Sequence, residues 1–489
     1  MESVIDSLNA AVPFSLGRAA VVIVPLLYLA GIATAVDAVM KSRTPQGSTA
    51  WVFALVAFPF VAVPLYWLVG RFTFGDYIEA LGDFDADVEQ QLCRALGQPP
   101  FVPEKAAGRE AGEERAFGAL GTVPFSCGNS ARLLVDGAAT FEALFAAIDR
   151  AEHTVLVQFY ILRDDRIGLD FQDCLLRAAA RDVHVCLLYD AVGSMSLGSR
   201  FLRTLRAGGV EVASFTGPRN WIKKLRLNFR NHRKIAVIDG RHAFVGGLNV
   251  GDEYLGRDET IGPWRDTHLA VEGPLVQALQ LSFARDWFYA RRAMIPGLVW
   301  VPTPAEADQT ALVLSSGPSD DVETCGLLYA HAIESAEERV WIATPYFIPD
   351  GRILGALELA ALRGVDVRVL VPRKSDSALF TYAPYAFLSE VTRVGVRVFL
   401  YEEGFLHEKV CLVDRDFALV GTANVDNRSF RLNFETTVVV RDGGFCGEVE
   451  RMLEADFARA TPLSAEALDG ASFAFRFAAS ATRLLAPIL

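Results

Sequence analysis

Two segments of the chain carry the same reactive side chains in the same order. The first segment holds His232, Lys234, Asp239, Gly246 and Asn249, and an identical residue follows each of them 175 positions later. The second set is His407, Lys409, Asp414, Gly421 and Asn424. Agreement of five polar or glycine positions at one offset indicates an internal duplication.

These side chains suit phosphoryl transfer, which needs a nucleophile, an acid for the leaving oxygen and fixed cations for the phosphate oxygens. Histidine and lysine two residues apart on an extended segment point to the same face, so two copies could pool their side chains in one cleft. No metal is expected at these motifs, because the cation beside each histidine would repel a divalent ion. We predict catalysis by His232, Lys234, His407 and Lys409, and phosphate binding by Asn249 and Asn424.

Four carboxylates accompany the motifs. A nucleophilic imidazole needs an acceptor that holds the proton on its other nitrogen. Asp266 in the first copy and Glu435 in the second each open an apolar run, so we expect each to orient the histidine of its own copy. Ordinary surface carboxylates are the alternative for both. Asp239 and Asp414 are candidates for catalysis or for bonds to turn backbone.

The HxKxxxxD…GxxN pattern in two copies resembles the phospholipase D superfamily, from about residue 130 to residue 460. Asn231 ahead of His232, residues 421–430 followed by Glu435, and an apolar N-terminus narrow the resemblance to bacterial cardiolipin synthases. Gly247 and Thr422 stand where the superfamily commonly has serine, which would weaken one phosphate contact at Gly247.

The resemblance implies one active site between pseudo-twofold halves and a covalent phosphohistidine intermediate, without metal or other cofactor. His232 would be the nucleophile and His407 the acid and base. The substrates would be two molecules of phosphatidylglycerol, and the products cardiolipin and glycerol. The alternatives are a hydrolytic phospholipase D, a phosphatidylserine-type transferase, a phosphodiesterase on nucleic acid and an inactive membrane scaffold. The acceptor alcohol and the oligomeric state stay open.

The elements that must position these residues alternate between strand and helix patterns. They run from residues 131–135 to 210–214 in the first copy and from 311–314 to 396–401 in the second. This alternation predicts an α/β body of βαβ units on a largely parallel sheet. We expect a transmembrane hairpin over residues 1–72, a connector over 73–122, and two phospholipase D-like halves over 123–300 and 301–489.

Two uncharged apolar runs open the chain, at residues 19–36 and 50–70. Each is long enough to cross a bilayer as a helix, so we predict a multi-pass protein of the bacterial inner membrane. A signal peptide is the alternative for the first run. Lys41 and Arg43 between the runs balance Arg18 and Arg71 outside them, so the side that carries the body stays open.

Composition excludes several classes of protein. Of 489 residues, 52% are hydrophobic and 22% charged, which excludes disorder. The net charge of −12 argues against a general nucleic-acid binder. The seven cysteines are scattered without a CxxC pair, so neither a disulfide framework nor a zinc site is expected.

Two segments are candidates for contact with anionic phospholipids. Residues 219–234 are rich in basic and apolar side chains and contain no acid, which favours a membrane surface; a solvated loop is the alternative. Its proposed surface residues are Lys223, Lys224, Arg226 and Arg230. Near the C-terminus, Phe473, Phe477 and Leu484 share one helical face, which would lie against the membrane or pack on the body.

Overall fold

The computed structural model describes residues 14–41, 45–70, 74–82, 84, 86–104, 108–215, 228–375, 378–484 and 486. Its contacts divide the chain into an N-terminal unit that ends at Phe74 and a body that begins at Gly75. The two are described separately.

The N-terminal unit contains α2 (Phe14–Lys41), α3 (Pro45–Ala57), α4 (Pro59–Leu65) and the π-helix η1 (Tyr66–Gly70). Within the described ranges, only Val21–Lys41 is long and apolar enough for a membrane span by length and composition. The second apolar run is interrupted at Phe58, which has φ −137° and ψ 57°, because Pro59 lacks the N–H that would continue α3. The expectation of a second spanning helix over residues 50–70 is therefore wrong, because α3, α4 and η1 divide that run.

Small residues let the helices of this unit approach one another closely. A Cβ atom at Gly31 would lie 2.5 Å from the carbonyl oxygen of Leu55, so only glycine fits there. The hydroxyl of Tyr66 donates to Asp37 Oδ2 over 3.0 Å, and its ring meets that of Trp51 edge to face. These contacts join α2 to the helices that follow it.

The body is built on a sixteen-stranded sheet. Fifteen strands lie in one continuous order whose two halves repeat each other, and the short strand β5 (Arg230–Asn231) pairs with β19 off this order. From the centre outward, the first half runs β1 (Ser126–Val135), β9 (Thr267–Glu272), β7 (His242–Gly246), β6 (Ile235–Ile238), β2 (Thr154–Phe159), β3 (His184–Tyr189) and β4 (Glu211–Ser214). The second half runs β10 (Gln309–Ser316), β19 (Asn433–Arg441), β17 (Phe417–Gly421), β16 (Val410–Val413), β11 (Arg339–Ala343), β13 (Asp366–Pro372), β14 (Arg397–Tyr401) and β20 (Ala460–Leu463). The matching order confirms the duplicated α/β body.

The sheet is mixed, and the expectation of a largely parallel sheet holds only for three strands in each half; the end strand β20 is antiparallel to β14. Strands β2, β3 and β4 are parallel, as are β11, β13 and β14. The motif strands are antiparallel because tight turns join β6 to β7 and β16 to β17. The central strands β1 and β10 are antiparallel and join the two halves into one sheet.

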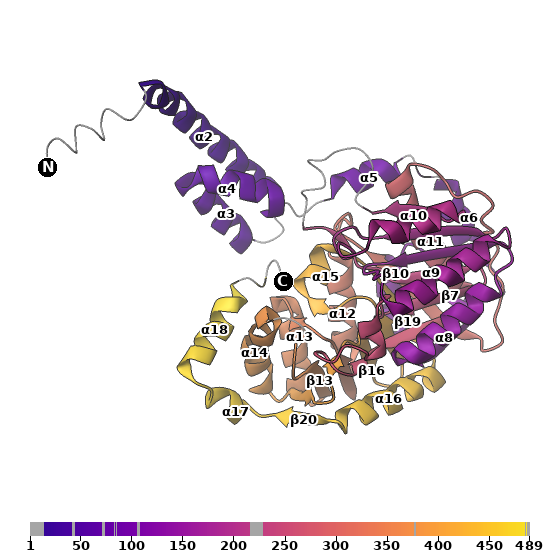
Figure 1. The fold of residues 1–489 in the computed structure, drawn as a ribbon. Helices are drawn as coiled ribbons and strands as arrows, with labels where there is room; N and C mark the ends of the chain where they lie inside the picture. Colours follow the sequence, from indigo (N-terminus) through magenta and orange to yellow (C-terminus); the bar gives the residue numbers. More distant parts are fainter. Residues whose placement is uncertain are drawn as a thin grey trace, which may run out of the picture. The chain divides into compact units, whose positions relative to one another are not determined.

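Helices cover both faces of each half-sheet. In the first half, Val155, Val157 and Phe159 of β2 face a core shared with α8 (Asp136–Asp149), α9 (Arg166–Ala179) and α10 (Ser199–Ala207). Gln158 points to the other face, where it donates to Asp286 of α11 (Leu275–Arg291). In the second half, α12 (Thr324–Ser335), α13 (Gly351–Leu362) and α14 (Ala378–Thr392) share the corresponding core, and α16 (Gly443–Phe457) is the counterpart of α11 (Figure 1).

Three helices occupy the segment expected to be a plain connector: α5 (Gly75–Leu81), α6 (Ala86–Leu96) and α7 (Gly108–Leu120). Phe117 of α7 is fully buried against Phe125 and Phe417. The hydroxyl of Tyr77 in α5 donates to Asp286 over 2.8 Å. These buried aromatic side chains dock α5 and α7 on the body.

Short elements complete the body. They are β5 (Arg230–Asn231), the 3-10 helix η3 (Asp252–Leu255), β8 (Trp264–Arg265), β12 (Phe347–Ile348), β15 (Phe405–Leu406), β18 (Val425–Asp426), α15 (Asn427–Arg431), α17 (Ala465–Asp469) and α18 (Phe473–Arg483). Two of them, β5 and β15, lead directly into the duplicated motifs.

Candidate active site

Each duplicated motif lies between a two-residue strand and a motif strand of its own half. His232 and Lys234 follow β5 and precede β6, while His407 and Lys409 follow β15 and precede β16. The lead-in strands pair with the opposite half: β5 with β19, and β15 with β8. The backbone N–H of His232 donates to the Phe434 carbonyl over 2.9 Å, and that of His407 to the Arg265 carbonyl over 2.7 Å. Each histidine is therefore held against the other copy.

The carboxylates pair with the histidines across the two halves. Nδ1 of His232 lies 3.0 and 2.9 Å from the two carboxylate oxygens of Glu435, and Nδ1 of His407 lies 2.7 Å from Asp266 Oδ2. The expectation that each carboxylate orients the histidine of its own copy is wrong. The parallel pairings of β5 with β19 and of β15 with β8 place the residue before each carboxylate beside the opposite motif, and this geometry causes the exchange.

Glu435 is completely buried and surrounded by donors. The hydroxyl groups of Thr422 and Ser429 and the amide of Asn433 all donate to it. Burial acts to raise its pKa, but His232, Lys234 and the Thr422 hydroxyl outweigh burial and lower the pKa below its usual value. The carboxylate is therefore ionised and can only accept hydrogen bonds.

Gly247 and Thr422, the two departures from the superfamily pattern, have different surroundings. A Cβ atom at Gly247 would lie 1.9 Å from Asp266 Oδ1, so the first copy has no room for a side chain there. In the second copy, the Thr422 hydroxyl instead donates to Glu435. Gly247 therefore leaves room for Asp266, and Thr422 donates a hydrogen bond to Glu435.

Both imidazoles are neutral near physiological pH. Burial lowers the pKa of His232 to about 4, against the opposing effect of Glu435. Burial, followed by the charge of Lys409, lowers the pKa of His407 to about 3. Because an ionised carboxylate only accepts hydrogen bonds, the proton of His232 resides on Nδ1. Nε2 of His232 then carries a lone pair.

The two lysines are buried beside the histidines. Lys234 Nζ donates to the carbonyl of His232 over 2.6 Å; Lys409 Nζ donates to the carbonyl of His407 and lies 2.9 Å from its Nδ1. Burial lowers the pKa of Lys234 to about 7 and that of Lys409 to about 8. Lys409 also lowers the pKa of His232, and Lys234 that of His407, so the two motifs interact electrostatically. Together these residues form one cluster of polar groups.

Asp239 and Asp414 lie at the far ends of the motif strands and bind turn backbone. Asp239 accepts hydrogen bonds from the N–H groups of Glu152, His153 and Thr154 over 2.8 to 2.9 Å. Asp414 accepts three from residues 337–339 in the same way. Strands β6 and β16 separate these carboxylates from Lys234 and Lys409. The geometry corrects the catalytic assignment and favours the structural alternative.

The two asparagines already have protein partners. Asn249 accepts from the backbone N–H of Ile161 and donates to the Tyr254 hydroxyl over 2.9 Å. Asn424 donates to Asp426 over 3.2 Å, and its Oδ1 is buried without a hydrogen-bond partner among the residues that the structure describes. Phosphate binding by these amides stays a prediction.

The structure places only one of the four residues expected at the membrane surface. Lys223, Lys224 and Arg226 lie outside the described residues. Arg230 is only 6% exposed and donates to the carbonyl of Phe229 over 2.6 Å, so it is not a surface residue. Arg230 belongs to β5, two residues before His232. Both residues of this lead-in strand are buried in the body, which explains why Arg230 is not exposed.

Two aromatic residues and two buried ion pairs were absent from the sequence prediction. The ring of Tyr160 lies 5.0 Å from His232, and that of Trp264 lies 5.0 Å from His407. The residue between histidine and lysine is Arg233 in one copy, paired with Asp286 at 2.8 Å. It is Glu408 in the other copy, paired with Arg265 at 2.7 Å. Among these residues, only Trp264 had a signal in the sequence, namely its position two residues before the predicted site residue Asp266.

Comparison with protein families agrees with this geometry. The family described as "Cardiolipin synthase, PLD-like domain" matches residues 144–287 and 329–457, which are the two halves of the body. The family described as "Phospholipase_D-nuclease N-terminal" matches residues 29–71. The chain belongs to the cardiolipin synthase family of the phospholipase D superfamily.

Full-length relatives within the cardiolipin synthases support this membership. "Cardiolipin synthase A" of Pseudomonas entomophila is 44% identical over 470 residues, covering 96% of this chain and 98% of that protein. "Cardiolipin synthase A" of Pseudomonas aeruginosa is 45% identical over 463 residues, covering 94% of each. The crystal structure of phosphatidylserine synthase from Haemophilus influenzae is 15% identical, covers 82% of this chain and 100% of its own, and has a TM-score of 0.57. That likeness supports the fold alone.

Proposed function

We propose that the chain joins two molecules of phosphatidylglycerol into cardiolipin and releases glycerol. The observation that carries this proposal is the pair of buried histidine–carboxylate contacts, each completed across the two halves of a cardiolipin synthase family member. The lysines beside them supply the positive charge that a phosphodiester needs.

In the first step, Nε2 of His232 attacks the phosphorus atom of one phosphatidylglycerol. The N–P bond forms while the bond between phosphorus and the glycerol oxygen breaks, and His407 donates a proton to that oxygen. Glu435 stabilises the positive charge that develops on His232. Glycerol leaves, and a phosphatidyl group stays on His232.

In the second step, His407 takes a proton from a hydroxyl group of a second phosphatidylglycerol. That oxygen attacks phosphorus, the N–P bond breaks, and cardiolipin is released. His407 must carry a proton in the first step, yet burial lowers its pKa to about 3 in the free protein. An anionic phosphodiester beside it raises that pKa, so substrate binding itself prepares the acid.

The choice of His232 as nucleophile is supported by the surroundings of its partner. Glu435 accepts three hydrogen bonds besides that of His232, which fixes the imidazole in one orientation. Nδ1 of His407 instead faces both Asp266 and Lys409. The ammonium group of Lys409 favours loss of a proton from His407, and a general acid must release its proton readily.

The substrates are lipids, and the chain has features suited to a bilayer. The helix over Val21–Lys41 is long enough to span one, and the interrupted run through Pro59–Leu68 completes a multi-pass hairpin in our proposal. The large side chains of Phe473 and Phe477 on α18, and of Leu484 directly after it, are exposed and would lie at the lipid interface.

The test is to incubate the purified full-length chain with phosphatidylglycerol alone and to resolve the lipid products by mass. Cardiolipin with an equal amount of glycerol supports the proposal. Phosphatidic acid without cardiolipin would indicate a hydrolase. Products that form only after serine or another alcohol is added would indicate a different transferase.

A further inference from the structure

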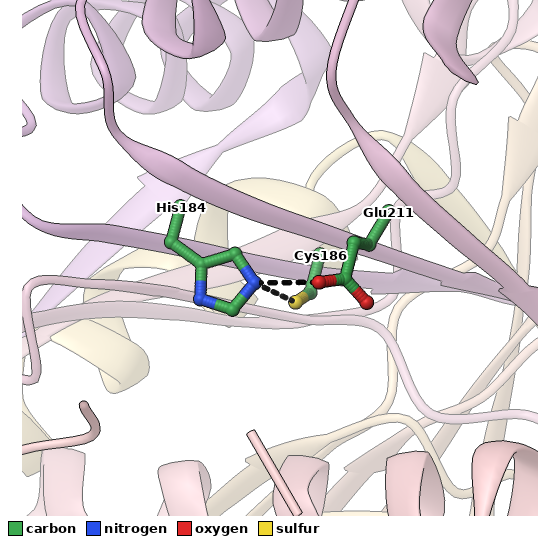
Figure 2. A group of neighbouring side chains, drawn as sticks. All are labelled: His184, Cys186 and Glu211. Carbon is green, nitrogen blue, oxygen red and sulfur yellow. Dashed lines mark hydrogen bonds and ion pairs between the residues drawn. The ribbon is translucent and has the colours of Figure 1, made fainter. Parts of the chain in front are cut away.

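A histidine, a cysteine and a glutamate converge at the outer edge of the first half-sheet, away from the catalytic motifs. They are His184 and Cys186 of β3 and Glu211 of β4 (Figure 2). Their donor atoms all lie within 4.8 Å of one another. Within the described ranges, no other group of three such side chains is arranged in this way.

The positions of these residues follow from strand geometry. His184 and Cys186 are two apart on β3 and share a face, whereas Val185 and Leu187 point into the core on the opposite face. Glu211 lies directly beside Cys186 in the parallel register of β3 and β4. Paired strands therefore hold all three side chains on one surface.

We propose that His184, Cys186 and Glu211 form a binding site for one divalent transition-metal ion of the zinc type. In tetrahedral geometry, with metal–nitrogen bonds of about 2.0 Å and metal–sulfur bonds of about 2.3 Å, the nitrogen and sulfur ligands lie about 3.5 Å apart. Cys186 Sγ lies 3.6 Å from Nε2 of His184. Nitrogen and oxygen ligands would lie about 3.3 Å apart, and Glu211 Oε1 lies 3.0 Å from the same Nε2.

The donor set selects the class of ion. Thiolate and imidazole favour Zn²⁺ and Co²⁺, whereas Mg²⁺ and Ca²⁺ prefer oxygen ligands alone. Cys186 is buried, but the side chain of Glu211 is 46% exposed. A water molecule can therefore reach the fourth position of the tetrahedron.

Metal binding exchanges the ion for a proton. The Cys186 thiol loses its proton to solvent, a metal–sulfur bond forms, and the ion replaces the contact between His184 and Glu211. A cysteine thiol is ordinarily protonated near neutral pH, so affinity should rise about tenfold per pH unit there.

Arg291 of α11 is the competing cation. Its Nη2 lies 4.0 Å from Glu211 Oε2, and its side chain is half exposed. Because a metal ion and this guanidinium repel one another, removing the charge of Arg291 should strengthen metal binding.

The experiment is a titration of the full-length chain in detergent with Co²⁺, followed by the near-ultraviolet charge-transfer absorption of a cobalt thiolate. We expect one Co²⁺ per chain, displaced by Zn²⁺. Cys186→Ser should abolish the band. The matched control is Cys174→Ser, because Cys174 is also a buried thiol beside a carboxylate, Asp149, but has no histidine. That variant should keep the band.

Variants of the other ligands keep the test decisive if Cys186→Ser fails to fold. His184→Gln and Glu211→Gln should each weaken Co²⁺ binding at least tenfold, and Arg291→Gln should strengthen it. Absence of a thiolate band, its survival in Cys186→Ser, or unchanged affinity in both His184→Gln and Glu211→Gln would overturn the proposal. Cardiolipin formation plays no part in this readout, so its outcome is independent of the proposed function.

Discussion

Glu435, in the second half of the body, holds Nδ1 of His232, in the first half, with its Oε2 2.9 Å from that nitrogen. Conversely, Oδ2 of Asp266, in the first half, lies 2.7 Å from Nδ1 of His407, in the second half. Each half contributes one histidine and the carboxylate for the other histidine. The consequences of a substitution should therefore appear in the opposite half.

The crossed pairs predict which imidazole each carboxylate controls. Glu435→Gln should lower kcat at least about 100-fold, because the amide no longer fixes the Nδ1–H tautomer or stabilises the imidazolium. Nitrogen NMR of histidine-labelled protein should show a changed tautomer at His232 and an unchanged signal at His407. Asp266→Asn is the matched control and should produce the reverse. A change confined to His407 in Glu435→Gln would contradict the crossed arrangement.

The two histidines can be separated by trapping the intermediate. In His407→Ala, a p-nitrophenyl phosphatidyl ester can still react, since its aryloxide leaves without an acid. The phosphatidyl group should then accumulate on His232, because no base remains to activate the acceptor. Peptide mass after a mildly alkaline quench locates the adduct. Labelling of His407 in His232→Ala alone would reverse the assigned roles.

The alkaline limit of activity should come from the lysines. Burial lowers the pKa of Lys234 to about 7 and of Lys409 to about 8, so each ammonium loses its proton as the pH rises through these values. Because the phosphate then loses its cations, kcat/KM for phosphatidylglycerol should fall over this range. Lys234→Arg, which stays charged, should move the decline to higher pH in any variant that retains activity. A kcat/KM that stays constant to strongly alkaline pH would exclude this cause.

Asp239 should matter for stability and not for chemistry. It accepts three backbone hydrogen bonds and has a positive φ of 54°. Asp239→Ala removes these bonds and should lower the free energy of unfolding by about 1–3 kcal/mol. Chemical denaturation measures the loss, and kcat/KM per folded molecule should change less than about twofold. Asp414→Ala is the matched test in the second copy; a stable but inactive variant would restore the catalytic assignment.

Helix α18 should bring the body to the lipid surface. Phe475 packs on Tyr382 and Tyr385 of α14, while Phe473 and Phe477 are 78% and 65% exposed. Replacing both exposed phenylalanines with serine should raise KM for phosphatidylglycerol in mixed micelles several-fold at unchanged kcat. The control is Leu169→Ser, an exposed apolar residue on α9. An equal rise in KM for the control, or none for the double variant, would exclude interfacial docking by α18.

The duplication could be predicted from sequence because histidine, lysine, glycine and asparagine keep one offset. The exchange of Asp266 and Glu435 could not. It depends on β5 and β15, strands of two residues that leave no periodic signal in the sequence. Arg230 was misplaced for a related reason, since it belongs to a basic run by composition but to β5 by pairing.

The proposed metal ligands illustrate a second limit of linear patterns. A search for CxxC spacing misses Cys186 because its partners are His184, two residues before it, and Glu211 on the next parallel strand. Register brings those residues together, and register is a property of the sheet. Similarly, Pro59 is evident in the second apolar run, but the sequence does not show whether it bends the helix or ends it.

The exchange of carboxylates also constrains how this chain can evolve. The two copies joined in one polypeptide are free to specialise only while each still supplies the carboxylate that the other histidine needs. A substitution of Asp266 would affect the orientation of His407, and a substitution of Glu435 would affect that of His232. Loss of either copy would leave the remaining histidine without its carboxylate and the remaining carboxylate without its histidine. The antiparallel pairing of β1 with β10 joins the sheets of these mutually dependent copies.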